Sequence, residues 1–157
     1  SVEALFKRLS KGKELPHINP LVDLNNAVSL KYTLPMGTHN LDNASTDIMM
    51  RLAQPETDEF IPLGKGKDDV EIPDESEVVY AVGNEVRTRR WTWRQSDKGK
   101  ITPDTTSVFF PIDGFVDVNK DAVDRAVADL SAQLEELFNV KIQSGIVDQA
   151  HQSFAWK

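Results

Sequence analysis

The chain contains no cysteine and only three histidines among its 157 residues. The absence of cysteine excludes disulfides, thiol nucleophiles and thiolate metal ligands. The histidines, His17, His39 and His151, are widely separated and show no His-x-x-x-His spacing, so they supply no metal-ligand motif. We therefore expect neither a metal ion nor a cofactor.

Long apolar runs are also missing. No run approaches the roughly 18 residues that a membrane-spanning helix needs, and Ser1-Val2-Glu3-Ala4 resembles neither a signal peptide nor a basic transit segment. These features predict a soluble, cytoplasmic protein without a membrane partner. The chain opens on Ser1 rather than methionine, which is consistent with an excision or processing boundary.

Positive charge is scarce across the chain as a whole. Lys and Arg together number 18 against 25 Asp and Glu, which gives a net charge of −7. This balance argues against coating of nucleic acid by the whole surface. Any contact with nucleic acid should therefore be confined to a local basic patch.

The length suits one domain over residues 1–157. Apolar residues recur at helical spacing in three segments, 1–11, 20–32 and 119–139. Short apolar or alternating runs predict strands over 48–53, 59–63, 77–82, 85–95, 106–112 and 140–142. The fold class is therefore α+β, a mixed or antiparallel sheet flanked by helices.

Connections between these runs predict how the strands pair. We expect 48–53 to pair with 59–63, and Gly83-Asn84 to turn 77–82 back onto 85–95 as a tight hairpin. The run 106–112 is the most apolar and should be an interior strand. Residues 64–77 lack periodicity and predict a surface loop, and 145–157 form a C-terminal extension.

One short run, Arg89 to Asp97, concentrates cations, aromatic rings and amide chemistry. As part of a regular strand, one face of 85–95 would carry Glu85, Arg87, Arg89, Trp91, Trp93 and Gln95, and the other would carry Val86, Thr88, Arg90, Thr92 and Arg94. A strand buried on both faces would not normally hold three arginines in six residues. The run is therefore the best candidate for a place that binds something anionic or planar.

Two separated motifs resemble a known family. The first is Asn19-Pro20-Leu21-Val22-Asp23-Leu24-Asn25-Asn26-Ala27-Val28-Ser29-Leu30 followed by Leu34-Pro35, and the second is Thr102-Pro103-Asp104-Thr105-Thr106-Ser107-Val108-Phe109-Phe110. They are similar to the B3/4-type tRNA-binding and editing domain of the phenylalanyl-tRNA synthetase β subunit. Arg90 to Asp97 is similar to a signature of the freestanding version. The family-like core would span 19–144.

The resemblance implies a pocket between these motifs, which in the synthetase hydrolyses tyrosine wrongly attached to tRNA. Asn25 and Asn26 fall where the family has a threonine or serine followed by an asparagine. The family's histidine falls on Gly37, with His39 two residues on, and its glutamate falls on Pro111. The scaffold and pocket are therefore expected, whereas editing of the same substrate by the same groups is in doubt.

Each candidate residue also has a plainer interpretation. Asn25 and Asn26 could satisfy local backbone groups within a helix, and His39 could be a solvated loop histidine. Trp91 and Trp93 could belong to the core, and Gln95, Ser96 and Asp97 could form an ordinary turn. The cations could simply pair with the acidic excess.

Two functional classes remain open from the sequence. The first is a tRNA-directed module that binds the aminoacyl end, with or without hydrolysis by Asn25, Asn26 or His39. Its substrate contacts would be Asn25, Asn26, Trp91, Trp93, Gln95, Ser96 and Asp97, and its nucleic-acid contacts Arg89, Arg90, Arg94, Lys98 and Lys100. The second is a protein that binds an amino-acid-like small molecule on the same scaffold, with no RNA partner and no catalysis.

Overall fold

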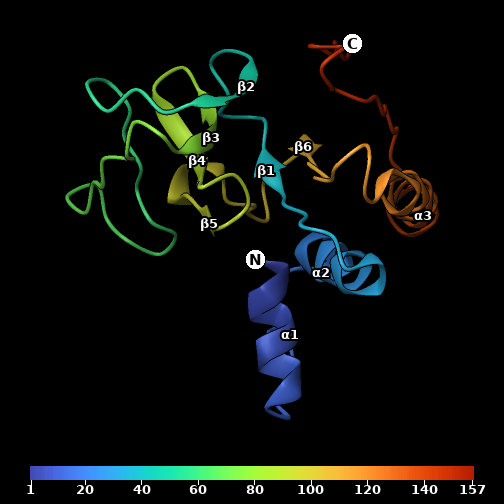
Figure 1. Cartoon of the computed structure of the whole chain (residues 1–157). Coiled ribbons are helices and arrows are strands. Elements are labelled where there is room, and N and C mark those ends of the chain that lie inside the picture. The colour runs from blue at the N-terminus through green and yellow to red at the C-terminus, as the bar shows by residue number, and fades with distance from the viewer.

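Three α-helices and two antiparallel sheets make up the fold in the computed structural model, which describes residues 1–157 (Figure 1). The helices are α1 (Val2–Ser10), α2 (Pro20–Tyr32) and α3 (Lys120–Phe138). The strands are β1 (His39–Asn40), β2 (Ile48–Leu52), β3 (Val78–Val82), β4 (Glu85–Arg89), β5 (Arg94–Gln95) and β6 (Val108–Phe109), with a short 3₁₀ helix, η1 (Asp97–Gly99). The predicted α+β class is confirmed.

The helices α2 and α3 form one core by packing their apolar stripes together. Asn19 begins α2 by accepting hydrogen bonds from the amides of Leu21 and Val22 at 2.9 and 3.1 Å. The buried apolar residues of this core are Leu24, Val28, Leu34, Ala126, Leu130 and Leu134. By contrast, α1 has no buried residue and projects from the body of the molecule beside α2 (Figure 1).

A second core lies on one face of the larger sheet, whose strand order is β2-β3-β4-β5. Phe60 is fully buried there, and the other buried apolar residues around it are Ala53, Val79, Ala81 and Val86. The smaller sheet pairs β1 with β6. It connects the two cores, because β1 directly follows α2 and His39 packs against Tyr80 of β3 at 5.9 Å between ring centroids.

A β-bulge in β4 changes which residues share a face. Tyr80 pairs with Thr88 and Ala81 pairs with Val86, so Arg87 is an extra residue on β4. Residues that pair across strands point to the same side of a sheet, so Val86 faces Phe60 and Thr88 faces the opposite side. The prediction that Val86 and Thr88 share a face is wrong, because strict alternation ends at the bulge.

The predicted strand 85–95 is also wrong, because the chain reverses after Arg89. Arg90 and Trp91 have φ angles of 48° and 61°, and the amide of Trp91 donates to the carbonyl of Val78 at 2.6 Å. Two successive left-handed residues turn the chain, so β5 folds back and pairs antiparallel with β4. Trp91 and Trp93 therefore lie in a turn and do not share a strand face.

Three other strand predictions need correction. Segment 59–63 forms only single bridges, from Glu59 to Glu85, Phe60 to Glu71 and Pro62 to Ser96, and β2 pairs with β3 instead. The run 106–112 contributes only the half-buried, two-residue β6, and 140–142 forms no strand. In each case an apolar run lacks a neighbouring strand with which it could form a full ladder.

None of the three helices has both the length and the hydropathy that a membrane span requires.

Arg89 holds the larger sheet to the loop before it. Arg89 is buried, and its guanidinium donates to both carboxylate oxygens of Glu77, which is also buried, and to Glu71 Oε2 at 2.7 Å. The hydrogen bonds from Arg89 lower the pKa of the Glu77 carboxyl to about 2, against the opposing effect of burial. Glu77 is therefore a buried anion that depends on Arg89.

Substitution of Arg89 should test this dependence. We expect Arg89→Met to lower the free energy of unfolding by about 3–5 kcal/mol, because it leaves the Glu77 carboxylate buried without its cation. Urea denaturation at neutral pH would measure this. Lys120→Met is the control, since Lys120 pairs with Asp124 on an exposed helix face and should cost about 0.5 kcal/mol or less.

The Arg89→Met difference should also shrink in acid. Glu77 has an ordinary pKa of 4.5 that falls to about 2 in the folded wild-type protein. Its stabilising contribution is therefore present above pH 4.5 and lost as the pH falls toward 2. An equal difference between wild type and variant at pH 7 and pH 3 would contradict this role.

Candidate functional site

A small cavity of about 90 Å³ lies where β3, β4 and β5 meet the chain segments that flank the smaller sheet. It is enclosed by residues from five separate parts of the chain: Ser1, Met36, Gly37, His39, Tyr80, Thr88, Trp91, Thr92, Trp93, Gln95, Pro111 and Asp113. These side chains include aromatic rings, a histidine and a single carboxylate. The mixture of apolar walls and few polar groups is typical of small-ligand sites.

A larger hollow of about 210 Å³ lies on another part of the surface, lined by Glu59, Ile61, Lys67, Val70, Glu85 and Lys98. Its Glu85 and Lys98 form an ion pair with each other at 3.1 Å. It contains no buried titratable group without a partner. We therefore take the smaller cavity, which is lined by a buried histidine, as the candidate site.

His39 lies in the wall of this cavity and is 1% exposed. Its Nε2 is 3.3 Å from the hydroxyl of Thr88, while its Nδ1 has no hydrogen-bond partner. Burial, and then the nearby Arg87 guanidinium, lower the pKa of His39 to about 4. The solvated-loop interpretation of His39 is therefore wrong, and its imidazole is neutral at physiological pH.

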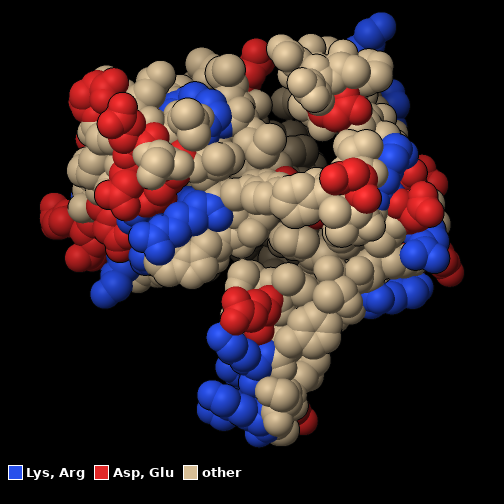
Figure 2. Space-filling view, in the orientation of Figure 1, with Lys and Arg blue, Asp and Glu red and all other residues tan.

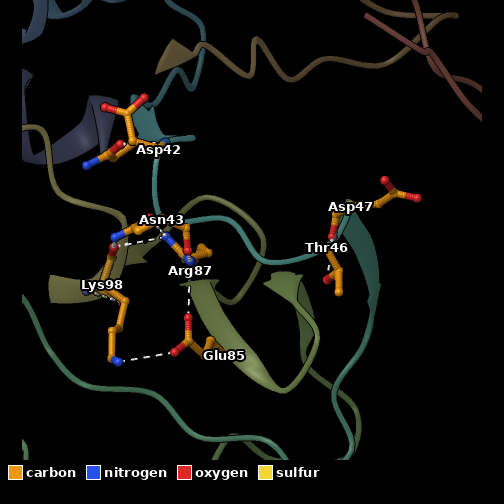
Figure 3. Close-up of polar contacts among 9 residues, drawn as sticks. Asp42, Asn43, Thr46, Asp47, Glu85, Arg87 and Lys98 are labelled. Carbon is orange, nitrogen blue, oxygen red and sulfur yellow. Dashed lines mark hydrogen bonds and ion pairs between the residues drawn. The ribbon is translucent and has the colours of Figure 1, made fainter. Parts of the chain in front are cut away.

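Arg87, the extra residue of the bulge, is a fully buried cation beside His39. Its guanidinium donates to the side chain of Asn43 at 2.9 Å, to the backbone oxygen of Lys98 at 2.9 Å and to Glu85 at 3.1 Å (Figure 3). Gly99 packs against both side chains, since a Cβ there would lie 3.4 Å from Arg87 Cδ and 3.5 Å from His39 Nδ1. The charge of Arg87 thus acts on His39 without lining the cavity.

Asp113 is the one carboxylate of the cavity wall. Its Oδ1 accepts hydrogen bonds from the hydroxyl of Tyr80 at 2.6 Å and from the indole nitrogen of Trp91 at 2.9 Å. Burial raises the pKa of the Asp113 carboxyl above its ordinary value, although both hydrogen bonds oppose this effect. Burial also raises the pKa of Tyr80, followed by the effect of Asp113. Two donors thus orient the Asp113 carboxylate, but they do not fully compensate for the solvation that it loses on burial.

The five cations predicted to contact nucleic acid are each paired with a carboxylate. Arg89 is buried against Glu77 and Glu71, and Arg94 donates to Glu71 at 3.0 and 3.1 Å. The remaining pairs are Arg90 with Glu77 at 3.7 Å, Lys98 with Glu85 at 3.1 Å and Lys100 with Asp97 at 3.0 Å. Red and blue side chains accordingly interleave over the sheet region (Figure 2).

Trp93 forms an exposed stack at the edge of the cavity. Trp93 is 43% exposed, and the guanidiniums of Arg90 and Arg94 lie 4.7 Å and 5.0 Å from its ring centroid. The side chain of Arg90 is itself 55% exposed. The arrangement places a flat aromatic surface and two cations beside the cavity mouth.

A family model described as "B3/4 domain" matches residues 1–154. The chain belongs to the B3/4 domain family. This confirms the resemblance drawn from the motifs at 19–35 and 102–110. No curated protein matches the chain.

The B3/4 domain places Asn25 and Asn26 on α2, and neither lines the cavity. Asn25 is buried with its Oδ1 unpartnered, and Asn26 is half-buried. The predicted His39, Trp91, Trp93 and Gln95 do line it. The structure thus brings four of the predicted residues together and keeps the asparagine pair apart from them.

Gln95, Ser96 and Asp97 have structural partners in this B3/4 domain. The amide of Gln95 donates to the carbonyl oxygens of Thr38 and Gly99. Ser96 is buried and caps η1 by accepting from the amide of Lys98 at 2.9 Å, and Asp97 accepts from Gly64 and Lys100. The turn interpretation therefore describes Ser96 and Asp97, while Gln95 fixes the cavity wall.

Three cavity residues, Tyr80, Thr88 and Asp113, were not anticipated as site residues from the sequence. The family's acidic position was placed on Pro111, which also lines the cavity, whereas the carboxylate stands two residues later. An acid directly after an apolar run, as Asp113 follows Ile112, was the available signal. No group of three or more His, Asp or Glu side chains is placed to hold a metal ion.

The neutral state of His39 predicts how stability changes with pH. An ordinary histidine has a pKa of 6.5, and that of folded His39 is about 4. As the pH falls from 6.5 to 4 the unfolded chain takes up a proton that the folded protein does not, so stability declines, by about 3 kcal/mol at most. Chemical denaturation across this range would measure the decline.

The variant His39→Gln should lose this part of the pH dependence, and the same substitution at exposed His17 should keep it. An NMR titration of the imidazole gives a direct check. A midpoint for His39 near 6.5 would show that neither burial nor Arg87 acts as described.

Proposed function

We propose that this B3/4 domain binds the aminoacylated 3′ end of a tRNA, with the amino acid in the cavity and the terminal nucleotides against Trp93. The observation that carries the proposal is the charge of the cavity wall. It contains one carboxylate, Asp113, and no lysine or arginine. An amino acid joined to tRNA through an ester retains its ammonium group but has no carboxylate charge, and this wall complements that combination.

Asp113 would receive the ammonium group. Its carboxylate loses solvation on burial, and its partners are the neutral donors Tyr80 and Trp91 rather than a cation. An ammonium group within hydrogen-bond distance would compensate that loss. The faces of Tyr80 and Trp91, whose polar atoms already bind Asp113, would border the bound amino acid. A free amino acid would bring an unpaired carboxylate into the same space, at a cost in binding free energy.

Trp93 would stack on a terminal base. Single-stranded RNA ends are recognised by aromatic surfaces with adjacent cations, and one stacked base contributes about 1–3 kcal/mol. Trp93 is exposed, and the guanidiniums of Arg90 and Arg94 lie close to its ring. Arg89 has no part in this contact, because its guanidinium is buried between Glu77 and Glu71.

Hydrolysis of the ester would need a positioned water and a donor for the developing oxyanion. The Arg87 cation beside Nδ1 favours the neutral tautomer of His39 with its hydrogen on Nε2, which then donates to Thr88. The Thr88 hydroxyl hydrogen is thereby left free to point into the cavity. Thr88 is the donor we propose for the ester carbonyl, with His39 as its positioning residue.

The second candidate is a small-molecule binder of the same scaffold, without RNA. It is favoured by the pairing of Arg94 with Glu71 and of Lys98 with Glu85, which reduces the positive potential of the predicted patch. The two candidates differ in ligand. The first requires an esterified amino acid on RNA, and the second requires binding of a free amino acid.

Trp93→Ala tests the RNA contact. We expect aminoacyl-tRNA affinity to fall by roughly tenfold to a hundredfold, because one stacking surface is lost. Filter binding at two salt concentrations would measure it, with release of the amino acid recorded on a panel of mischarged tRNAs. Trp156→Ala is the matched control, since Trp156 is equally exposed but lies in the C-terminal segment. Unchanged affinity in Trp93→Ala would remove Trp93 from the contact.

Asp113→Asn tests recognition of the ammonium group. The wild-type protein should bind an aminoacyl-tRNA roughly tenfold or more tightly than its N-acetylated form, because acetylation removes the charge that Asp113 complements. The variant should bind both forms alike. Tight binding of free amino acids by the wild-type protein, with no preference for the ester, would instead support the second candidate.

A further inference from the structure

Three of the lysines and arginines that form no ion pair lie close together in the sequence at the end of α1, away from the predicted basic run. Arg8, Lys11 and Lys13 are exposed and form no ion pair, although Arg8 donates to the backbone oxygen of Glu14 at 2.6 Å. Lys7 in the same segment pairs with Glu3 on the surface. Figure 2 shows Lys and Arg side chains along the projecting helix. By contrast, Lys65 and Lys67 lie in a loop where two acids, Asp68 and Asp69, directly follow Lys67.

The position of α1 relates this charge to the cavity. Ser1, immediately before α1, lines the cavity together with Trp93, and the helix then runs away from that mouth (Figure 1). Nine residues span about 13 Å. A stacked strand rises roughly 3.4 Å per nucleotide, so the free cations lie about four nucleotides from the mouth.

We infer that α1 and the turn after it, residues 7–13, form a second RNA contact that binds backbone phosphates of the strand whose end enters the cavity. The inference rests on the proposed function. It explains how an acidic chain could still hold a polyanion. The cations near the cavity are paired with carboxylates, whereas Arg8 on α1 and Lys11 and Lys13 just after it are exposed and form no ion pair. Phosphate contacts of this kind position the RNA and carry no sequence information.

The test is the salt dependence of tRNA binding by Lys11→Ala/Lys13→Ala. Two lost phosphate contacts should lower the slope of log affinity against log salt by about 1.4–1.8, and should reduce affinity on the order of tenfold at low salt. Charge reversal at both positions, Lys11→Glu/Lys13→Glu, should reduce it further. The matched control is Arg125→Ala/Lys141→Ala, which removes two exposed and unpaired cations from α3 and the segment after it.

A short probe separates this contact from the cavity. An aminoacylated dinucleotide carrying only the 3′ end should bind wild type and Lys11→Ala/Lys13→Ala equally, while tRNA should distinguish them. Loss of tRNA binding in Trp93→Ala but not in the lysine variants would overturn the α1 contact and leave the proposed function standing. No tRNA binding by the wild-type protein would overturn both.

Leu9 and Phe6 of α1 are also exposed, so binding of α1 to a lipid surface is the competing outcome. Sedimentation with vesicles containing phosphatidylserine would test it. Vesicle binding that the lysine variants lose, together with tRNA binding that they keep, would overturn the RNA contact.

Discussion

The β-bulge at Arg87 is the constraint on which both halves of the molecule depend. One extra residue in β4 places Val86 against the Phe60 core and Thr88 against His39, on opposite faces of the sheet. In a regular strand these two residues would share a face, so either the core would lose Val86 or the cavity would lose Thr88. The extra residue also changes the face to which Arg89 points. The Arg89 side chain then bonds Glu77 and so holds the loop before β3 against the sheet.

The bulge also explains why a fully buried arginine is tolerated. Arg87 replaces part of its lost hydration with contacts to Asn43, Lys98 and Glu85, drawn from three different segments, while its Nε has no partner. Its charge then reaches His39 across Gly99 without occupying the cavity. The cavity wall therefore combines a neutral histidine with a lone carboxylate, and the proposed preference for an aminoacyl ester over a free amino acid rests on this combination.

The local surface charge of this protein depends on which cations pair with carboxylates, and not on how many basic residues a run contains. Glu71 and Glu77 come from the loop and strand entry that precede the hairpin, yet they meet Arg89 and Arg94 across space. A run that is strongly basic in sequence therefore forms a locally neutral surface. Lys11 and Lys13 after α1, by contrast, form no ion pair although the run that carries them is less conspicuous in the sequence.

Local patterns were sufficient for the helices. The segment 20–32 was predicted with its observed bounds, because Asn19, Pro20 and an apolar stripe are signals that act within one turn. The family could also be inferred, since its motifs are contiguous. The site could be predicted only in part, as His39, Trp91, Trp93 and Gln95, because these stand inside or beside such motifs.

The sequence by itself determined the helices, the α+β class and the family, all of which depend on neighbours in the chain. Only the tertiary structure decided where β4 ends, since the turn at Arg90 and Trp91 uses left-handed backbone without a glycine to signal it. It also decided the cavity. Tyr80, Thr88 and Asp113 come together through strand register, the bulge and the packing of β3 near 111–113, and these are interactions between residues that no short-range pattern connects.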